Sequence, residues 1–203
     1  MKRLVASLAV WAALSASVFA APQTFDFKDP KGVNNAIFKT DAVLESINGA
    51  ANGVSGKVTF DAANPGATKG KIVVAANSLT VPNKMMNEHL FSPMWLDVQK
   101  YPEITFDVKE LKNVKTNGDT TTADAVGTFT LHGVSKELTA PVKLTYLPGK
   151  LGQRVPNMKG DLLVVRTNFE IKRSEFAINA GQNNDKVSDE INLSLSIAGA
   201  AAK

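Results

Sequence analysis

The stretch LVVRTNFEIK, residues 163–172, alternates between apolar and polar side chains from Val165 onward. One side collects the apolar residues together with one threonine: Leu163, Val165, Thr167, Phe169 and Ile171. Successive side chains of a strand point to opposite faces, so this period of two predicts a long strand with one buried and one wet face. The next residue on the apolar side of this strand, two positions after Ile171, is the charged Arg173.

The same period recurs along the chain. It is clear over residues 104–108 and again over 191–197, near the C-terminus. Further candidate strands cover residues 24–28, 35–39, 56–61, 70–79, 120–131 and 137–147. Turn-forming runs such as Asn64-Pro65-Gly66 separate several of them. About eight antiparallel strands with one apolar face predict an all-β domain, built as a barrel or as a sandwich.

Residues 83–97 break this pattern and predict one or two short helical turns. Asn83 is a suitable N-cap, because its side chain can accept a hydrogen bond from the first turn. Pro93 prevents the helix from continuing, since it has no N–H to donate.

The first twenty residues have the composition of an export signal. Lys2 and Arg3 form a short basic start, an apolar run from Leu4 to Phe19 follows, and small residues precede Ala21. Sixteen apolar residues are short for a membrane span. We therefore expect residues 1–20 to be cleaved, leaving a single domain over residues 21–203 in the periplasm.

Composition excludes several classes of protein. The chain has no cysteine, which rules out disulfide scaffolds, thiolate metal sites, cysteine nucleophiles and a lipoprotein anchor. Removal of Lys2 and Arg3 with the signal lowers the formal net charge from +4 to +2. The remaining basic residues are scattered among acidic ones, so nucleic-acid binding is not expected.

Histidine chemistry rests on two residues, His89 and His132. His132 lies at a strand-to-turn junction and is expected at the surface. His89 lies beside Glu88 and near Asp97, so it is an acid/base, a ligand contact or a locally hydrogen-bonded residue. No metal-binding pair, GxSxG elbow or phosphate-binding loop occurs, and we expect neither a metal nor a cofactor.

Aromatic and large apolar residues gather on the predicted strands and in the helical segment. They include Phe38, Phe60, Phe106, Phe129 and Phe169, with Phe91, Trp95 and Leu96 in the helical segment. Such residues pack a core, or they line a cavity if a barrel of about eight strands encloses a ligand. Arg173 is either a surface or salt-bridged residue at the barrel end, or a contact for a polar head group.

Three blocks of sequence, taken in their order along the chain, form a distinctive pattern. The first is NEHL at 87–90, followed by WLD at 95–97 and KYPEITF at 100–106. The second is GTFTLHGVSK at 127–136, followed by Ala140-Pro141-Val142. The third is RSEFAI at 173–178, followed by VSDEI at 187–191.

In this order the blocks resemble the signature of the YceI-like family, the polyisoprenoid- or lipid-binding proteins of the bacterial periplasm. Two departures are visible: residues 34–41 lack the histidines that many members carry in that strand, and Ala177 replaces a glycine. The resemblance implies a lipocalin-like antiparallel barrel that holds a long apolar chain, with the helical segment near its opening. It also makes a homodimer plausible.

The leading hypothesis is therefore a binding or carrier protein for an amphiphilic lipid, without a permanent membrane anchor and without enzymatic activity. The expected contacts for the lipid tail are Phe60, Phe106, Phe129, Phe169 and Phe176, bordered by Phe91, Trp95 and Leu96. His89 and Arg173 are the candidates for the polar end. Two rivals stay open: an enzyme that uses His89 on a lipid-like substrate, and a stress-related structural barrel filled by its own side chains.

Overall fold

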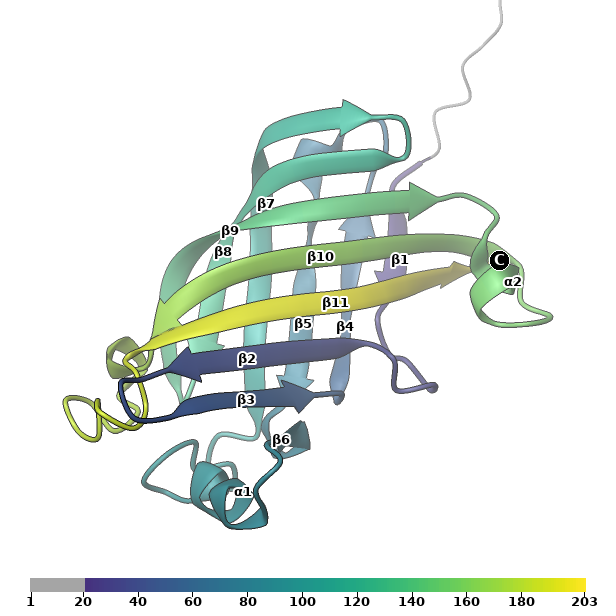
Figure 1. Ribbon diagram of the computed structural model, residues 1–203. Helices are drawn as coiled ribbons and strands as arrows, with labels where there is room; N and C mark the ends of the chain where they lie inside the picture. Colours follow the sequence, from purple (N-terminus) through teal and green to yellow (C-terminus); the bar gives the residue numbers. More distant parts are fainter. Residues whose placement is uncertain (1–20) are drawn as a thin grey trace, which may run out of the picture.

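The computed structural model describes residues 21–203, and the predicted export signal lies outside them. The described chain forms one antiparallel sheet in the order β1-β4-β5-β7-β8-β9-β10-β11-β2-β3-β6, with a further pairing between β1 and β11 (Figure 1). The strands are β1 (Gln23–Asp26), β2 (Asn35–Asp41), β3 (Ser46–Ala51), β4 (Val54–Phe60), β5 (Lys69–Ala75), β6 (Leu79–Thr80), β7 (Glu103–Asn117), β8 (Thr120–Leu131), β9 (Val134–Leu147), β10 (Gly160–Lys172) and β11 (Glu190–Ala202).

The sheet closes on itself as a barrel of eight strand positions, as predicted. Three of these positions are each filled by two short strands, one after the other along the barrel wall. β1 and β2 share the position beside β11. β4 and β3 share the next position, where β4 pairs with β1 and β3 with β2, and β5 and β6 share the one after, where β5 pairs with β4 and β6 with β3. Closure removes the unpaired edges that a sandwich would leave.

Asn34 bridges the interruption between β1 and β2. Its side chain is 1% exposed, and its Nδ2 donates to the Phe27 and Ala198 carbonyl oxygens at 2.9 and 3.1 Å. Its Oδ1 accepts from the Ala198 N–H at 2.8 Å. A side-chain amide thus replaces the main-chain ladder where the strand is broken, so that no buried backbone group of Ala198 is left unpaired.

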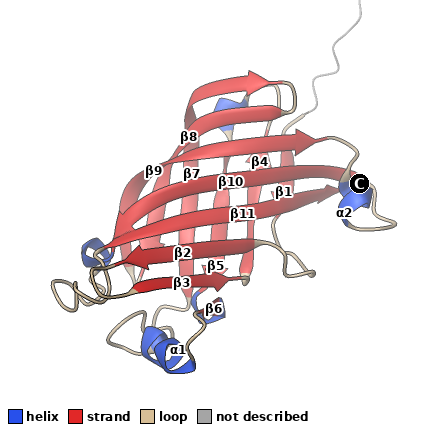
Figure 2. Ribbon diagram, in the orientation of Figure 1, coloured by secondary structure: helices blue, strands red, loops and turns tan. Residues whose placement is uncertain are grey.

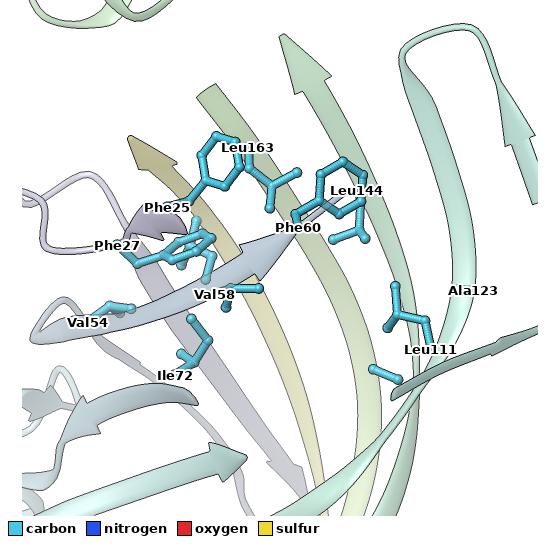
Figure 3. Packing of buried hydrophobic residues seen from close by; sticks show 12 residues of the cluster. Phe25, Phe27, Val54, Val58, Phe60, Ile72, Leu111, Ala123, Leu144 and Leu163 are labelled. Carbon is cyan, nitrogen blue, oxygen red and sulfur yellow. The ribbon is translucent and has the colours of Figure 1, made fainter. Parts of the chain in front are cut away.

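Aromatic side chains fill one end of the barrel, which we call the floor. Phe25, Phe27 and Phe60 are at most 3% exposed, and they pack with Leu163 and Ile197 (Figure 3). The Tyr146 ring lies 6.1 Å from that of Phe25 and 5.9 Å from that of Phe60. This end is packed like an ordinary protein core.

Asp161 is buried beside the floor, at the start of β10. It accepts hydrogen bonds from the Gly149 N–H at 2.8 Å and the Tyr146 hydroxyl at 3.0 Å, and it pairs with Lys203 at 3.1 Å. Burial by itself raises the pKa of this carboxyl, but the hydrogen bonds from Gly149, Gln23, Lys203 and Tyr146 outweigh burial and hold the pKa at about 2.

Short helices lie at the ends of the barrel, as Figure 2 shows. The predicted helical segment is α1 (Lys84–Phe91), where the Asn83 Oδ1 accepts from the Met86 N–H at 3.2 Å as an N-cap. The others are α2 (Leu151–Arg154), η1 (Pro65–Ala67), η2 (Ala76–Ser78) and η3 (Arg173–Phe176). Within residues 21–203 no helix is both long and apolar enough to cross a bilayer.

Candidate functional site

A cavity of about 660 Å³ occupies the barrel between the floor and α1. Side chains of β2, β4, β5 and β7–β11 form its wall, and residues of α1 and of the turn that follows cover its other end. The wall is almost entirely apolar, and includes Val58, Ile72, Val74, Ile104, Val108, Leu111, Leu144, Val165, Ile171, Leu193 and Leu195. The volume falls in the range of pockets that bind small organic ligands.

Small residues on β8 and β9 leave this half of the barrel hollow. The inward positions of β8 begin with Thr121, Ala123, Ala125 and Gly127, all buried. Ala125 pairs directly with Ala140 of β9, and both line the cavity while being 2% exposed. Large side chains at Ala125 and Ala140 would enter the cavity. Ala123 instead packs in the cluster of the floor, and a Cβ at Gly127 would meet the Asp107 carbonyl oxygen. The alternation of small residues over 121–127 is visible in the sequence, but none of these residues was among the predicted contacts.

Five of the expected tail contacts lie on the cavity wall: Trp95, Leu96, Phe106, Phe129 and Phe169. Phe106 and Phe129 are cross-strand neighbours, and the ring of Phe129 lies edge-on to that of Phe169, with 5.9 Å between centroids. Aromatic groups from β7, β8 and β10 thus form one packed cluster on the cavity wall.

The other three expected tail contacts lie away from the lining. Phe60 belongs to the floor. Phe176 is 1% exposed and packs behind Phe129, with its ring edge-on at 5.5 Å. Phe91 is half-buried against the same cluster. Alternation fixes the side of the strand on which a side chain lies, whereas its depth along the barrel decides whether it reaches the cavity.

Arg173 is buried, so the expectation of a surface position is wrong. Its side chain is 2% exposed, and the guanidinium lies 5.6 Å from the Trp95 ring. Its acceptors are the carbonyl oxygens of Ile178, Asn179, Gln182, Val187 and Ser188 and the Asn184 side chain. A guanidinium has five N–H donors, and these acceptors occupy them all.

Arg173 itself lines the cavity, and so do Asn183 and Val187 of the loop that its hydrogen bonds hold. Burial lowers the pKa of Arg173, and the charge of Asp189 opposes that effect. Burial also acts to raise the pKa of Asp189, but hydrogen bonds from the Ser174 hydroxyl and N–H, at 2.7 and 2.8 Å, outweigh it and lower this pKa. The pair thus remains ionised where the loop meets the barrel.

Polar side chains line the cavity at the α1 end, which we call the mouth. His89 lies in the last turn of α1 and is exposed, and Glu45, Asn183 and Lys186 line the same region. Within residues 21–203 no hydrogen bond joins the His89 imidazole to the carboxylates of Glu88 or Asp97, and no group of three or more metal-ligating side chains occurs. The sequence analysis did not single out Glu45, Asn183 and Lys186, because they lie in turns without a motif.

His132 occupies a turn, as expected, but it is half-buried rather than at the surface. Its Nδ1 lies 3.1 Å from the Phe176 carbonyl oxygen, and its ring lies 4.7 Å from that of Tyr101. It does not line the cavity. It joins the β8–β9 turn to η3, which is a structural role.

Comparisons with known proteins agree on one family. The family model described as the YceI-like domain matches residues 28–199. A UPF0312 protein of Pseudomonas paraeruginosa is 33% identical over 204 residues, with 98% of each chain covered. A UPF0312 protein of Yersinia pestis is 34% identical over 155 residues, which covers 76% of this chain and 74% of the relative.

Solved structures resemble the fold as well. The Campylobacter jejuni YCEI protein superposes with a TM-score of 0.62 and 25% identity, over 75% of this chain and 83% of that one. BcnA of Burkholderia cenocepacia has a TM-score of 0.66 at 20% identity, over 81% of this chain and 95% of that one. A domain of Saccharophagus degradans described as polyisoprenoid-binding has a TM-score of 0.63 at 13% identity, over 89% of this chain and 99% of that one.

Proposed function

The chain belongs to the YceI-like family, and on that premise we propose that it is a binding or carrier protein whose barrel cavity holds the apolar tail of an amphiphilic lipid. The observation that carries this proposal is the hollow half of the barrel. A space of about 660 Å³ lies between a packed aromatic floor and a polar mouth, with an apolar wall throughout. Such a cavity matches a molecule that is apolar along most of its length and polar at one end.

Burial of the tail supplies the affinity. Each methylene group removed from water contributes about 0.8 kcal/mol, so a chain of several carbons needs few polar contacts to bind. Two of the threonine hydroxyls on the wall make little demand on a ligand, because Thr68 donates to the Pro65 carbonyl at 2.6 Å and Thr167 to the Pro141 carbonyl at 2.7 Å. An acyl or isoprenoid chain is therefore the ligand class that this wall favours.

Individual residues have distinct proposed roles. Phe106, Phe129 and Phe169 contact the tail, and Trp95 and Leu96 border it near the mouth. The remaining expected contacts act indirectly: Phe60 closes the floor, Phe176 supports Phe129, and Phe91 anchors α1. His89 faces the polar end of the ligand, while Arg173 acts on that end by fixing the loop and the face of Trp95.

A polyisoprenoid is the first ligand to test, since the structurally similar domain of Saccharophagus degradans is described as binding one. The proposal further includes cleavage of residues 1–20, a single domain over residues 21–203, a periplasmic location, no permanent membrane anchor and no catalysis. A homodimer is compatible with it.

The decisive experiment identifies what the purified protein carries. The full chain is expressed with its export signal, purified from the cell envelope fraction and extracted with organic solvent, and the extract is analysed by mass spectrometry. A stoichiometric lipid with one long apolar chain is expected. A protein that repeatedly yields no lipid, and that also fails to take up a fluorescent fatty acid such as parinaric acid, contradicts the proposal.

A further inference from the structure

Large apolar side chains are exposed to solvent around the mouth of the cavity. Val43 is 91% exposed and Leu44 63%, in the turn between β2 and β3. Met85 is 66% exposed at the start of α1, and Met94 is 68% exposed just after that helix. We call these four residues the mouth rim. Side chains of this kind gain free energy when they leave water, so a group of them at one opening indicates a contact surface.

The mouth rim is continuous with the inside of the cavity. Met94 itself lines the cavity, as does Glu45, the neighbour of Leu44. Met85 precedes His89 by four residues, so both lie on the same face of α1, and His89 lines the cavity.

A hydrogen bond ties the two sides of the mouth together. The Leu44 N–H donates to the Asp185 carbonyl oxygen at 2.9 Å. This bond joins the β2–β3 turn to the loop from which Asn183 and Lys186 reach the cavity. In Figure 1 that turn, the loop and α1 all lie toward the same end of the molecule. The apolar side chains of the rim therefore surround the opening through which a ligand enters.

Acidic side chains outnumber basic ones beside the mouth rim. The exposed or half-exposed ionisable side chains that adjoin it are Asp41, Glu45, Lys84, Glu88, Asp185 and Lys186. Four are acidic and two are basic, so the rim offers no positive field toward anionic lipids. This excess of negative charge disfavours an anionic bilayer and is compatible with a zwitterionic one.

We propose that the mouth rim inserts into the interfacial region of a zwitterionic lipid bilayer, so that the cavity opens toward the membrane and not toward water. The inference rests on the proposed function, because a lipid cargo gives this contact its purpose. Transfer of a lipid between the cavity and a membrane slows about fourfold for each methylene of the tail that is exposed to water on the way. Direct contact between the mouth and the bilayer avoids that exposure.

Vesicle binding tests the inference without any ligand. Delipidated protein is sedimented with sucrose-loaded vesicles of phosphatidylcholine and phosphatidylethanolamine, and the partition coefficient is measured. The rim variant combines Val43→Ser, Leu44→Ser, Met85→Ser and Met94→Ser. We expect its partition coefficient to fall about tenfold or more, while adding anionic phosphatidylglycerol does not strengthen wild-type binding.

A matched control uses two exposed apolar residues near α2. Val33 is 57% exposed and Met158 42%, and neither lines the cavity. Val33 lies in the β1–β2 loop, where its N–H donates to Asp29. Asp29 in turn forms an ion pair with Arg154 of α2 at 2.7 Å, and Met158 lies just after α2. The variant Val33→Ser/Met158→Ser should bind vesicles within about twofold of wild type.

Several results would overturn the membrane contact. Wild-type protein that stays in the supernatant contradicts it, and so does an equal loss in the control variant. A lipid-free dimer in sedimentation velocity that the rim variant abolishes would assign the rim to a second copy of the chain. Uptake of parinaric acid is measured on the same samples: uptake without vesicle binding refutes this inference alone, whereas vesicle binding without uptake refutes the proposed function.

Discussion

The substitution Ala140→Phe places an aromatic ring in the hollow half of the barrel and tests whether the space is real. Ala140 is 2% exposed, lines the cavity and lies directly opposite Ala125 on the neighbouring strand. A ring at this position points inward, because it keeps the parity of Ala140 on β9. The third hypothesis, a barrel filled by its own side chains, leaves no room for that ring.

The two hypotheses differ in the free energy of unfolding. Extra carbon atoms forced into a packed core cost about 1–3 kcal/mol. In a cavity of about 660 Å³ the ring has room, so we expect the free energy of unfolding to change by less than about 1 kcal/mol. The ring also excludes part of the ligand tail, at about 0.8 kcal/mol for each excluded methylene, which weakens binding about fourfold per methylene.

The assay combines urea unfolding with displacement of parinaric acid by saturated fatty acids of increasing length. Long acids should lose affinity in the variant, while short ones keep theirs. Thr139→Phe is the control, since Thr139 is exposed on the outer face of the same strand and its substitution should leave length preference unchanged. A variant that loses 1–3 kcal/mol of stability and weakens all acids equally would refute the hollow barrel.

Three further predictions concern charged and titratable residues. The carboxylate form of Asp161 stabilises the fold, because its pKa of about 2 lies below the usual value near 4. Its contribution of about 2 kcal/mol to the free energy of unfolding is therefore present above pH 4 and is lost as the pH falls from 4 to 2. In urea unfolding, Asp161→Asn should flatten this part of the stability profile, whereas Asp107→Asn, at an exposed site, should not. Arg173→Met leaves several buried carbonyl oxygens without a donor, so we expect the free energy of unfolding in the same assay to fall by at least about 3 kcal/mol. The control Arg166→Met, at an exposed site, should lower it by less than about 0.5 kcal/mol. His89→Ala should weaken lipid binding only slightly, by a few-fold at most, and should leave the thermal midpoint unchanged, because the side chain is exposed. The enzyme hypothesis instead requires that turnover disappears while parinaric acid still binds.

The alternation of side chains was sufficient to predict the strands and the class of fold. β10 was found close to its actual bounds. The C-terminal strand was predicted only over 191–197, whereas β11 continues to Ala202, because its last residues are small and pair with the start of β10. The broken strand positions were harder, since the join between β1 and β2 depends on Asn34 reaching Ala198, a residue 164 positions away. A contact at that separation has no local signal in the sequence.

The candidate site was predicted less completely, for two physical reasons. Phe60 and Phe129 both point into the barrel, yet Phe60 fills the floor and Phe129 faces the cavity. Strand tilt and register decide how far along the barrel axis each side chain lies. The hollow itself depends on residues that are small, such as Ala125 and Ala140, and a search for large apolar side chains passes over them.

Arg173 illustrates a more general point about how this site selects its ligand. An arginine that ends an apolar strand face looks like a head-group contact, yet its donors are occupied by the loop that covers the mouth. The groups left free to meet a polar head are exposed ones, His89 and Lys186, and an exposed contact in water contributes little affinity. The apolar wall, by contrast, contributes with every methylene that it covers. We therefore expect this barrel to discriminate among ligands mainly by the length and shape of the tail, and only weakly by the chemistry of the head.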